Sequence, residues 1–300
     1  MNSHSVSLRD TECFIPVEDG LRVWTRCLGG GSPDERAPII VLHGGPGIPH
    51  DYLENLAALA SPIQRLVFYD QLGCGHSDCP DEPQRWRLPR FVTEIDQVRQ
   101  ALGLERVVLL GQSWGGMLAI EYALMQPQGL IGLILANSTA SAPLFAAETQ
   151  RLRAMLPPEI QTILTYHENA GTTDHAAYQT AMGAFYARHV IRLHPMPECV
   201  QRAFNQAGQP YGVMWGASEF NLTGNLKEWD RTDRLGEIRV PTLLISGEYD
   251  ESTPAINRAL QRGLPDARWV MLDNCSHLAH VEAPDQYQQA VRDFLDSLPR

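Results

Sequence analysis

The hexapeptide Gly111-Gln112-Ser113-Trp114-Gly115-Gly116 joins two segments of different character. The residues before it, 107–110, are all valine or leucine, which predicts a buried strand. The residues after it, 117–125, have a helical pattern. A serine between a strand and a helix, with glycines two positions away on either side, is the context of a nucleophile elbow, where a sharp turn exposes the hydroxyl. Ser113 is therefore the candidate nucleophile, and the helix start behind it favours developing negative charge.

The same alternation of apolar runs and helical patterns extends over much of the chain. Helical patterns also occur at residues 91–102 and 287–298. Apolar runs lie at residues 39–42, 66–70, 107–110, 130–135, 242–245 and 269–272. Strands that are apolar on both faces and alternate with helices predict a mostly parallel sheet with helices on both sides. Residues 11–26 predict an antiparallel hairpin before this sheet, with its turn at 18–20.

Residues 139–231 interrupt this alternation with a helical pattern that contains no buried-strand run. Ligands bind beyond the carboxyl ends of the strands in open α/β sheets, so we expect a helical cap over that edge. Two or three ordinary packing helices are the alternative. With the elbow, these patterns predict the α/β-hydrolase fold, with a core at residues 1–138 and 232–300 and a cap at 139–231.

A serine nucleophile needs a base, and the base needs an acid that orients it. In this fold the three follow the chain order serine, acid, histidine. Asp250 follows the apolar run at 242–245, and His277 lies 27 residues further along. His280 and Asp273 are alternatives for the two roles. We prefer His277 because it falls in the loop just past the last strand, and Asp250 because Asp273 would share that loop with the histidine.

An oxyanion hole requires two N–H donors near the nucleophile. One is expected from the backbone of Trp114, the residue after the serine. The other is expected from the loop His43-Gly44-Gly45-Pro46-Gly47, which follows an early apolar run. Glycine lets the backbone approach a substrate closely. We expect the Gly45 N–H to be this donor, with the Gly44 N–H as the alternative.

Composition narrows the range of partners. With 24 basic and 35 acidic residues the formal charge is −11, which argues against nucleic acid and anionic membranes. The apolar stretch 130–136 is shorter than the ~20 residues of a membrane span, and residues 1–5 do not resemble a secretory signal. The six cysteines form no C-x-x-C pair, which predicts free thiols in a cytoplasmic protein, with a Cys74–Cys79 pair less favoured. No metal or cofactor is expected.

Several motifs together resemble the proline iminopeptidases, serine aminopeptidases with an α/β-hydrolase core and a helical cap. The motifs lie at residues 43–47, 70–77, 111–116, 211–220, 224, 229–230, 247–254 and 275–277. The resemblance covers most of the chain, from about Val17 to Leu298, and supports Ser113, Asp250 and His277 as the triad. One departure is Leu72, where many members of the family carry arginine.

The resemblance implies that Glu219 and Glu251 hold the α-amino group of the substrate and that Tyr211 lines the same pocket. Two carboxylates can bind one ammonium through charge-assisted hydrogen bonds. Taken without the resemblance, both glutamates would be expected at the surface, because most glutamates are exposed. Trp215 and Phe220 are expected to add aromatic walls to the pocket.

These observations predict a serine hydrolase that cleaves the amide bond after an N-terminal amino acid of a short peptide or small molecule, through an acyl-enzyme. The segments 126–138 and 168–172 are closer to the bacterial L-amino acid amidases, so peptides and simple amides both remain candidate substrates. A general carboxylesterase, in which the two glutamates would be idle, is the alternative within this fold. A non-catalytic receptor built on the same scaffold is the alternative from another class.

Overall fold

The computed structural model describes residues 8–32 and 34–299 and contains one eight-stranded sheet. Its strands are β1 (Asp10–Pro16), β2 (Arg22–Leu28), β3 (Ile39–Leu42), β4 (Leu66–Tyr69), β5 (Val107–Gln112), β6 (Leu130–Ala136), β9 (Thr242–Gly247) and β10 (Ala267–Leu272). Their spatial order is β1-β2-β4-β3-β5-β6-β9-β10. Every neighbouring pair from β4 to β10 is parallel, whereas β2 is antiparallel to both its neighbours. The predicted mostly parallel sheet and the hairpin of β1 and β2 are confirmed.

Helices cover both faces of the sheet, as predicted. One face carries α1 (Leu88–Ala101), α2 (Trp114–Leu124) and α7 (Pro254–Gly263). The other carries the 3-10 helix η2 (His50–Leu59), α8 (Ala279–Glu282) and α9 (Pro284–Ser297). Successive strand residues point to opposite faces, so Ile40 and Leu42 join the first core while Ile39 and Val41 join the second. This explains why the central strands are apolar at every position.

Strand β10 differs from the expectation of burial on both faces. It lies at the edge of the sheet, and only its last residue, Leu272, is fully buried, while Met271 is 43% exposed. An edge strand has a neighbour on one side only and is less completely covered by helices. Trp269 is instead tied to the next strand by an Nε1–H bond to Ser246 Oγ (3.0 Å). An apolar run alone therefore did not distinguish an edge strand from a central one.

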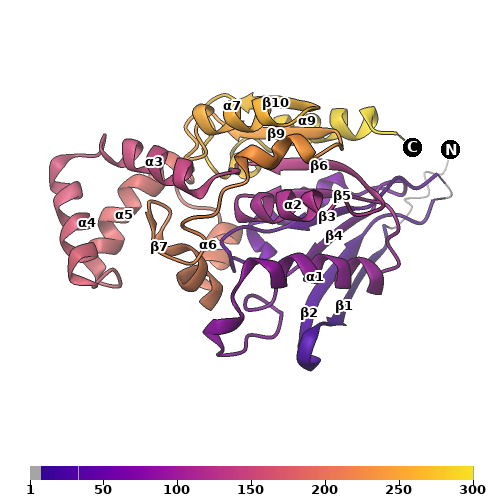
Figure 1. Cartoon of the computed structure of the whole chain (residues 1–300), viewed down its shortest axis with the longest axis horizontal. Coiled ribbons are helices and arrows are strands. Elements are labelled where there is room, and N and C mark those ends of the chain that lie inside the picture. The colour runs from indigo at the N-terminus through magenta and orange to yellow at the C-terminus, as the bar shows by residue number, and fades with distance from the viewer. Residues whose placement is uncertain (1–7, 33, 300) are drawn as a thin grey trace.

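The segment between β6 and β9 is largely helical. It forms α3 (Ala142–Arg153), α4 (Pro158–Ala170), α5 (Ala176–His189), α6 (Glu198–Asn205) and a ribbon of β7 (Gly216–Ser218) and β8 (Asn221–Leu222). Helices α3, α4 and α5 lie together at the left of the molecule, beyond one end of the sheet (Figure 1). The ribbon was not predicted, because strands of three and two residues are too short to show a period.

The two ends of this segment meet at its base. The Ala142 N–H donates to the Trp229 carbonyl (2.8 Å), and the Arg231 N–H donates to the Ala140 carbonyl (2.8 Å). Ser141 Oγ also bonds Asp230 Oδ2 (2.6 Å). The chain thus leaves the sheet and returns to it at one place. The division into a core and a cap at 139–231 stays a prediction, supported by this closure.

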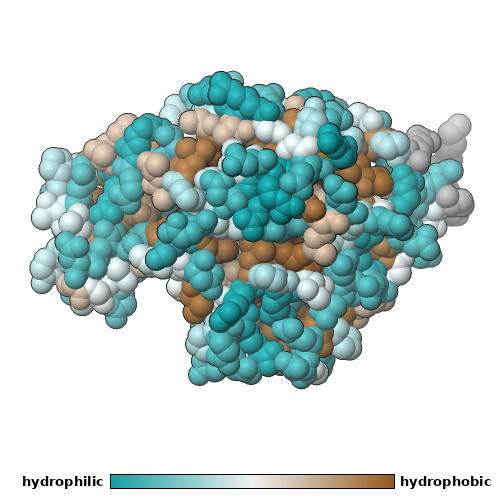
Figure 2. Space-filling model, viewed as in Figure 1, coloured by the Kyte–Doolittle hydropathy of each residue, from teal (hydrophilic) through white to brown (hydrophobic). Residues whose placement is uncertain are grey.

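The face shown in Figure 2 is mostly hydrophilic, with hydrophobic residues in small areas. Within residues 8–32 and 34–299, no helix is long and apolar enough to cross a membrane. All six cysteines lie in these ranges and are free thiols, as the sequence predicted.

Candidate active site

Ser113 lies at the junction of β5 and α2, with a left-handed backbone (φ 55°, ψ −120°) that is costly for a non-glycine residue. Its N–H donates to the Ala136 carbonyl of the neighbouring strand (2.9 Å). The flanking glycines leave no space for side chains. A Cβ on Gly111 would lie 2.2 Å from the Gly115 carbonyl oxygen, and one on Gly115 would lie 2.0 Å from the Leu42 carbonyl oxygen. Both positions therefore require glycine for the strand and the helix to pack this closely.

His277 and Asp250 come from the loops that follow β10 and β9. His277 Nδ1 bonds Asp250 Oδ1 (2.8 Å), and the two residues are only 4% and 2% exposed. Asp250 also accepts bonds from Asn137 Nδ2 (2.6 Å) and from the Ser252 N–H (2.8 Å). The carboxylate is thus fixed from three sides. It orients the imidazole with Nδ1 toward Asp250 and leaves Nε2 to act on a substrate.

The two competing residues are placed elsewhere. His280 lies in α8, and its Nε2 bonds the Tyr52 carbonyl (3.0 Å). Burial lowers the pKa of His280 to about 4, which keeps this imidazole neutral. Asp273 is exposed to solvent. These positions support the preference for His277 and Asp250.

Gln112 links the elbow to the histidine loop, because its Nε2 donates to the His277 carbonyl (3.3 Å). Among the described residues, Ser113 Oγ makes no hydrogen bond, and His277 Nε2 lies 3.7 Å from Glu251 Oε1. Bonds between a nucleophile and its base are often long without substrate and tighten when substrate binds. The structure therefore links the elbow to the histidine loop through Gln112, without a direct bond between Ser113 and His277.

The charge around His277 favours its protonated form. Burial alone would lower the pKa of His277, but the negative charge and hydrogen bond of Asp250, and the charge of Glu219, outweigh it. The net result is a pKa above the ordinary histidine value of 6.5. A base of this kind accepts the serine proton readily and is neutral only at higher pH.

The loop after β3 supplies the candidate oxyanion donors. The Gly44 N–H is occupied, because it donates to the Tyr52 hydroxyl (2.7 Å). In the part of the chain that the structure describes, neither the Gly45 N–H nor the Trp114 N–H meets an acceptor. A Cβ on Gly44 would lie 3.1 Å from Ser113 Cβ, so the loop abuts the nucleophile. Of the two alternatives, this geometry favours Gly45 as the second donor.

Two buried glutamines hold this loop in place, and sequence reasoning missed both roles. The Tyr52 hydroxyl donates to Gln112 Oε1 (2.6 Å), which connects the Gly44 N–H to the elbow. On the other side, Gln71 Nε2 donates to the His43 carbonyl (2.9 Å), and Gln71 Oε1 accepts the Trp114 indole N–H (2.8 Å). Gln71 and Gln112 stand inside the recognised motifs, but Tyr52 carries no sequence signal of its own.

The glutamate pair, Glu219 and Glu251, is buried beside the triad. Their exposed fractions are 8% and 0%, so the surface position expected of ordinary glutamates is wrong for both. The Tyr211 hydroxyl donates to Glu219 Oε1 (2.8 Å). Among the described residues, neither oxygen of Glu251 has a hydrogen-bond partner, and no lysine or arginine pairs with either glutamate.

Burial dominates the electrostatics of this pair. It raises the pKa of Glu219, although the nearby His277 opposes the shift. Burial also raises the pKa of Glu251 well above its usual range, and the charges of Glu219 and Asp250 raise it further. Burial and like charge therefore favour a proton on one of the two carboxyl groups when no cation is bound.

A cavity of about 610 Å³ is lined in part by Glu219, but not by Glu251. We call it the cap pocket. Its lining includes Ile48, Met182, Tyr186, Phe204, Tyr211 and Glu219. Tyr186 was not predicted; burial and the charges of Glu219 and Glu251 raise its pKa well above the ordinary value.

The predicted aromatic walls lie elsewhere. Trp215 is buried against Phe145 (ring centroids 5.3 Å apart), and Phe220 packs on Phe185 (4.8 Å). Neither Trp215 nor Phe220 lines the cap pocket, whereas Tyr211 does. The indole N–H of Trp215 is buried and has no acceptor within the described ranges. The cap pocket therefore gives no support to the predicted pocket roles of Trp215 and Phe220.

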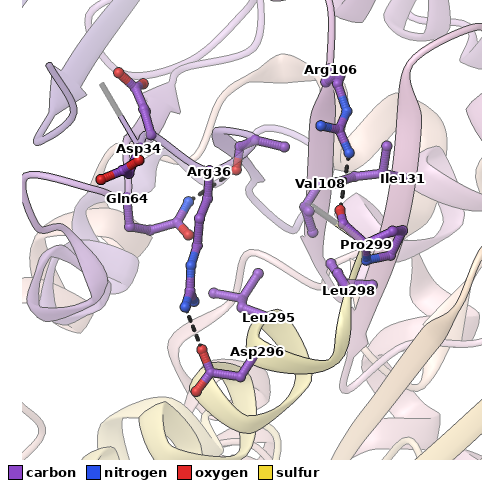
Figure 3. Close-up of a pocket in the computed structure, with 12 residues that line it drawn as sticks. Asp34, Arg36, Gln64, Arg106, Val108, Ile131, Leu295, Asp296, Leu298 and Pro299 are labelled. Atoms are coloured by element: carbon purple, nitrogen blue, oxygen red, sulfur yellow. Dashed lines mark hydrogen bonds and ion pairs between the residues drawn. The ribbon is translucent and has the colours of Figure 1, made fainter. Parts of the chain in front are cut away.

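A second cavity, of about 460 Å³, lies at the opposite edge of the sheet, near the starts of β3, β5 and β6 (Figure 3). Two of its charged side chains are already paired. Arg36 meets Asp296 (2.6 Å), and Arg106 donates to the Pro299 carbonyl (3.0 Å). It contains none of the predicted site residues. In residues 8–32 and 34–299, no group of three or more His, Cys, Asp or Glu side chains is arranged to hold a metal ion.

Comparisons with known proteins identify the family of the chain. Residues 37–284 match the family described as alpha/beta hydrolase fold. A proline iminopeptidase of Lactobacillus delbrueckii subsp. bulgaricus is 39% identical over 96% of this chain and 98% of its own length. VinJ, known from a crystal structure, is 39% identical in sequence to this chain. The two structures match with a TM-score of 0.92 over 96% of this chain and 99% of VinJ. The proline iminopeptidase of Mycobacterium smegmatis, also known from a crystal structure, is 38% identical in sequence. It matches with a TM-score of 0.86 over 95% of this chain and 98% of its own chain.

The Tyr52 hydroxyl provides a test of the loop geometry. In Tyr52→Phe the Gly44 N–H and Gln112 Oε1 both lose their partner, which frees the oxyanion loop to shift. We expect kcat to fall ~10-fold or more with KM little changed, because misplaced donors act on the transition state. Tyr287→Phe is the matched control, since Tyr287 is equally buried but its hydroxyl has no partner within the described residues. Equal kcat values for the two variants would contradict this role of Tyr52.

The raised pKa of His277 provides a second test. The rate at which a fluorophosphonate modifies Ser113 requires neutral His277 and no amine binding. Because the pKa is raised, His277 keeps its proton to higher pH, and the rate should fall on acidification with a midpoint above 6.5. Asp250→Asn removes the opposing charge, so the midpoint should move to lower pH and kcat should drop by ~10³–10⁴. A wild-type midpoint at or below 6.5, or one that Asp250→Asn leaves unmoved, would refute this electrostatic role.

Proposed function

Because this chain belongs to the proline iminopeptidase family of the α/β-hydrolase fold, we propose that it hydrolyses the amide bond after an N-terminal amino acid with a free α-amino group. The substrates are short peptides or small amides, proline derivatives among them. The observation that carries the proposal is the glutamate pair, Glu219 and Glu251, buried beside His277 with no lysine or arginine partner in the described part of the chain.

A cationic ligand would compensate the charge of the two buried glutamates. An unpaired carboxylate in a dry site is strongly unfavourable, and its usual remedies are protonation or a cation. A substrate α-ammonium carries a positive charge and several N–H donors, so it compensates both carboxylates at once. Since the ammonium is one carbon from the carbonyl carbon, fixing it also fixes the scissile bond. The pair thus turns recognition of a free amino terminus into positioning for attack.

The chemistry follows from the neighbouring groups. Ser113 Oγ attacks the carbonyl carbon while His277 Nε2 takes its proton, and Asp250 stabilises the imidazolium. The N–H groups of Gly45 and Trp114 hold the oxyanion. His277 then protonates the leaving amine as the C–N bond breaks. Water attacks the resulting acyl-enzyme with the same base and releases the free amino acid and Ser113.

A general carboxylesterase would use the same triad and oxyanion donors. It would leave Glu219 and Glu251 without a function, and their burial with no lysine or arginine partner among the described residues argues against that. A non-catalytic receptor has no need of the fixed Asp250–His277 pair beside a strained serine. We further infer a cytoplasmic location, because six free thiols suit a reducing compartment.

The test compares proline p-nitroanilide with its N-acetyl derivative and with p-nitrophenyl butyrate. We expect the free amine to exceed the acetylated amide by ~10² or more in kcat/KM, because acetylation leaves the buried carboxylates uncompensated. Glu219→Gln should lower kcat/KM for the free amine and leave butyrate hydrolysis unchanged. Glu228→Gln, at an exposed cap glutamate, is the control. Fastest turnover of the butyrate, with no effect of acetylation, would instead establish an esterase.

The buried pair should also limit stability. The folded-state pKa of Glu251 is raised, so the folded protein holds this proton to higher pH than the unfolded chain, and stability is lost as pH rises above the unfolded pKa. Glu251→Gln should therefore raise Tm at pH 8, with much less effect at pH 5, while increasing KM for the free amine. Thermal unfolding at both pH values measures this. A variant that melts below wild type at pH 8 would show that the carboxylate is compensated within the protein.

A further inference from the structure

The cap pocket has charge of opposite sign at its buried and exposed parts. Its only carboxylate is Glu219, which is buried. Its only guanidinium is Arg192, which is exposed, and the neighbouring His194 is exposed as well. A molecule that fills the pocket from Glu219 outward would therefore meet negative charge first and positive charge last.

The Arg192 guanidinium is free to bind an anion. It stacks 3.9 Å from the centroid of the Tyr249 ring, which holds its position. Its backbone N–H donates to Glu282 Oε1, but among the described residues its side chain forms no ion pair. Glu282 is itself engaged by the Ser276 hydroxyl (2.9 Å). A carboxylate at the rim would thus find an unpaired planar donor group.

The walls between these two ends are largely apolar. They include Met182 and Tyr186 from α5, Ile191 and Met196 from the segment that follows, and Phe204 from α6. The cavity volume of about 610 Å³ falls in the range of ~300–1,000 Å³ that accommodates drug-sized ligands. The pocket therefore has room for more than the first residue of a substrate, and its walls favour apolar side chains.

The pocket also adjoins the oxyanion loop. Ile48 lines it, and the Ile48 N–H donates to the Gly44 carbonyl (3.2 Å) on the same loop as Gly45. Ser113 and His277 do not line the pocket, so its connection to the site runs through Glu219 and through Ile48 beside the oxyanion loop.

From this arrangement we propose that the preferred substrates are short peptides with an apolar residue after the scissile bond and a free α-carboxylate that pairs with Arg192. This rests on the proposed function, since it takes the glutamate pair as the site of the ammonium. The protein would thus read both ends of a short peptide: the ammonium in the buried part of the pocket and the carboxylate at its rim.

The experiment uses Pro-Leu-Gly as the free acid and as its C-terminal amide. We expect the wild-type protein to favour the free acid about five-fold in kcat/KM at low salt, as for an exposed ion pair of good geometry. The preference should shrink as salt is added. In Arg192→Gln it should fall to about one, with kcat/KM for the amide unchanged. Arg188→Gln, an exposed arginine of α5 outside the pocket lining, should retain the wild-type preference.

A second comparison tests the apolar walls. Pro-Leu-Gly should be cleaved faster than Pro-Glu-Gly, and Met182→Glu should reduce that preference, because Met182 is part of the apolar wall. Equal rates for the acid and the amide in wild type, or a preference that survives Arg192→Gln, would refute the proposal that Arg192 pairs with the substrate carboxylate. If Met182→Glu instead altered the choice of the first residue, the pocket would hold the N-terminal side chain and the proposal would be wrong. Failure to cleave any free-amine substrate would refute the proposed function itself.

Discussion

The strained backbone of Ser113 is the constraint on which the site depends. Its left-handed turn is possible because Gly111 and Gly115 let β5 and α2 pack without side chains between them. Since Gly115 also contacts the end of β3 at Leu42, the same close packing brings the following glycine loop against the nucleophile. One packing requirement thus places the serine and the candidate oxyanion donors together, and the hydrogen bonds of Tyr52, Gln71 and Gln112 hold them there.

In the glutamate pair, an arrangement that destabilises the folded protein serves the proposed function. Glu219 comes from the β7–β8 ribbon and Glu251 from the loop after β9, so the pair forms only when the inserted segment sits over the sheet. Their mutual repulsion and burial destabilise the empty protein, and a bound ammonium relieves both. The cap pocket continues from this point, which makes the amine the fixed end of any longer substrate.

The sequence predicted the central strands, the elbow and the chain order of Ser113, Asp250 and His277, because these follow from local periodicity and motif spacing. It could not show that β10 is an edge strand, since burial depends on neighbours that are distant in sequence. It left Gly44 as an alternative to Gly45 for the second oxyanion donor. The hydrogen bond from the Gly44 N–H to the Tyr52 hydroxyl, which favours Gly45, could not be predicted from the sequence. Only the family resemblance indicated a binding role for Glu219 and Glu251, because glutamate side chains are usually exposed at the surface.

The central claim is that the glutamate pair binds an α-ammonium. Calorimetric titration of Ser113→Ala protein with L-prolinamide at pH 6, where the α-amino group is protonated, tests it directly. Binding should release protons from the pair, so that the observed heat changes with the ionisation enthalpy of the buffer, and N-acetyl-L-prolinamide should not bind. Equal binding of the two ligands, with no buffer dependence, would contradict the claim.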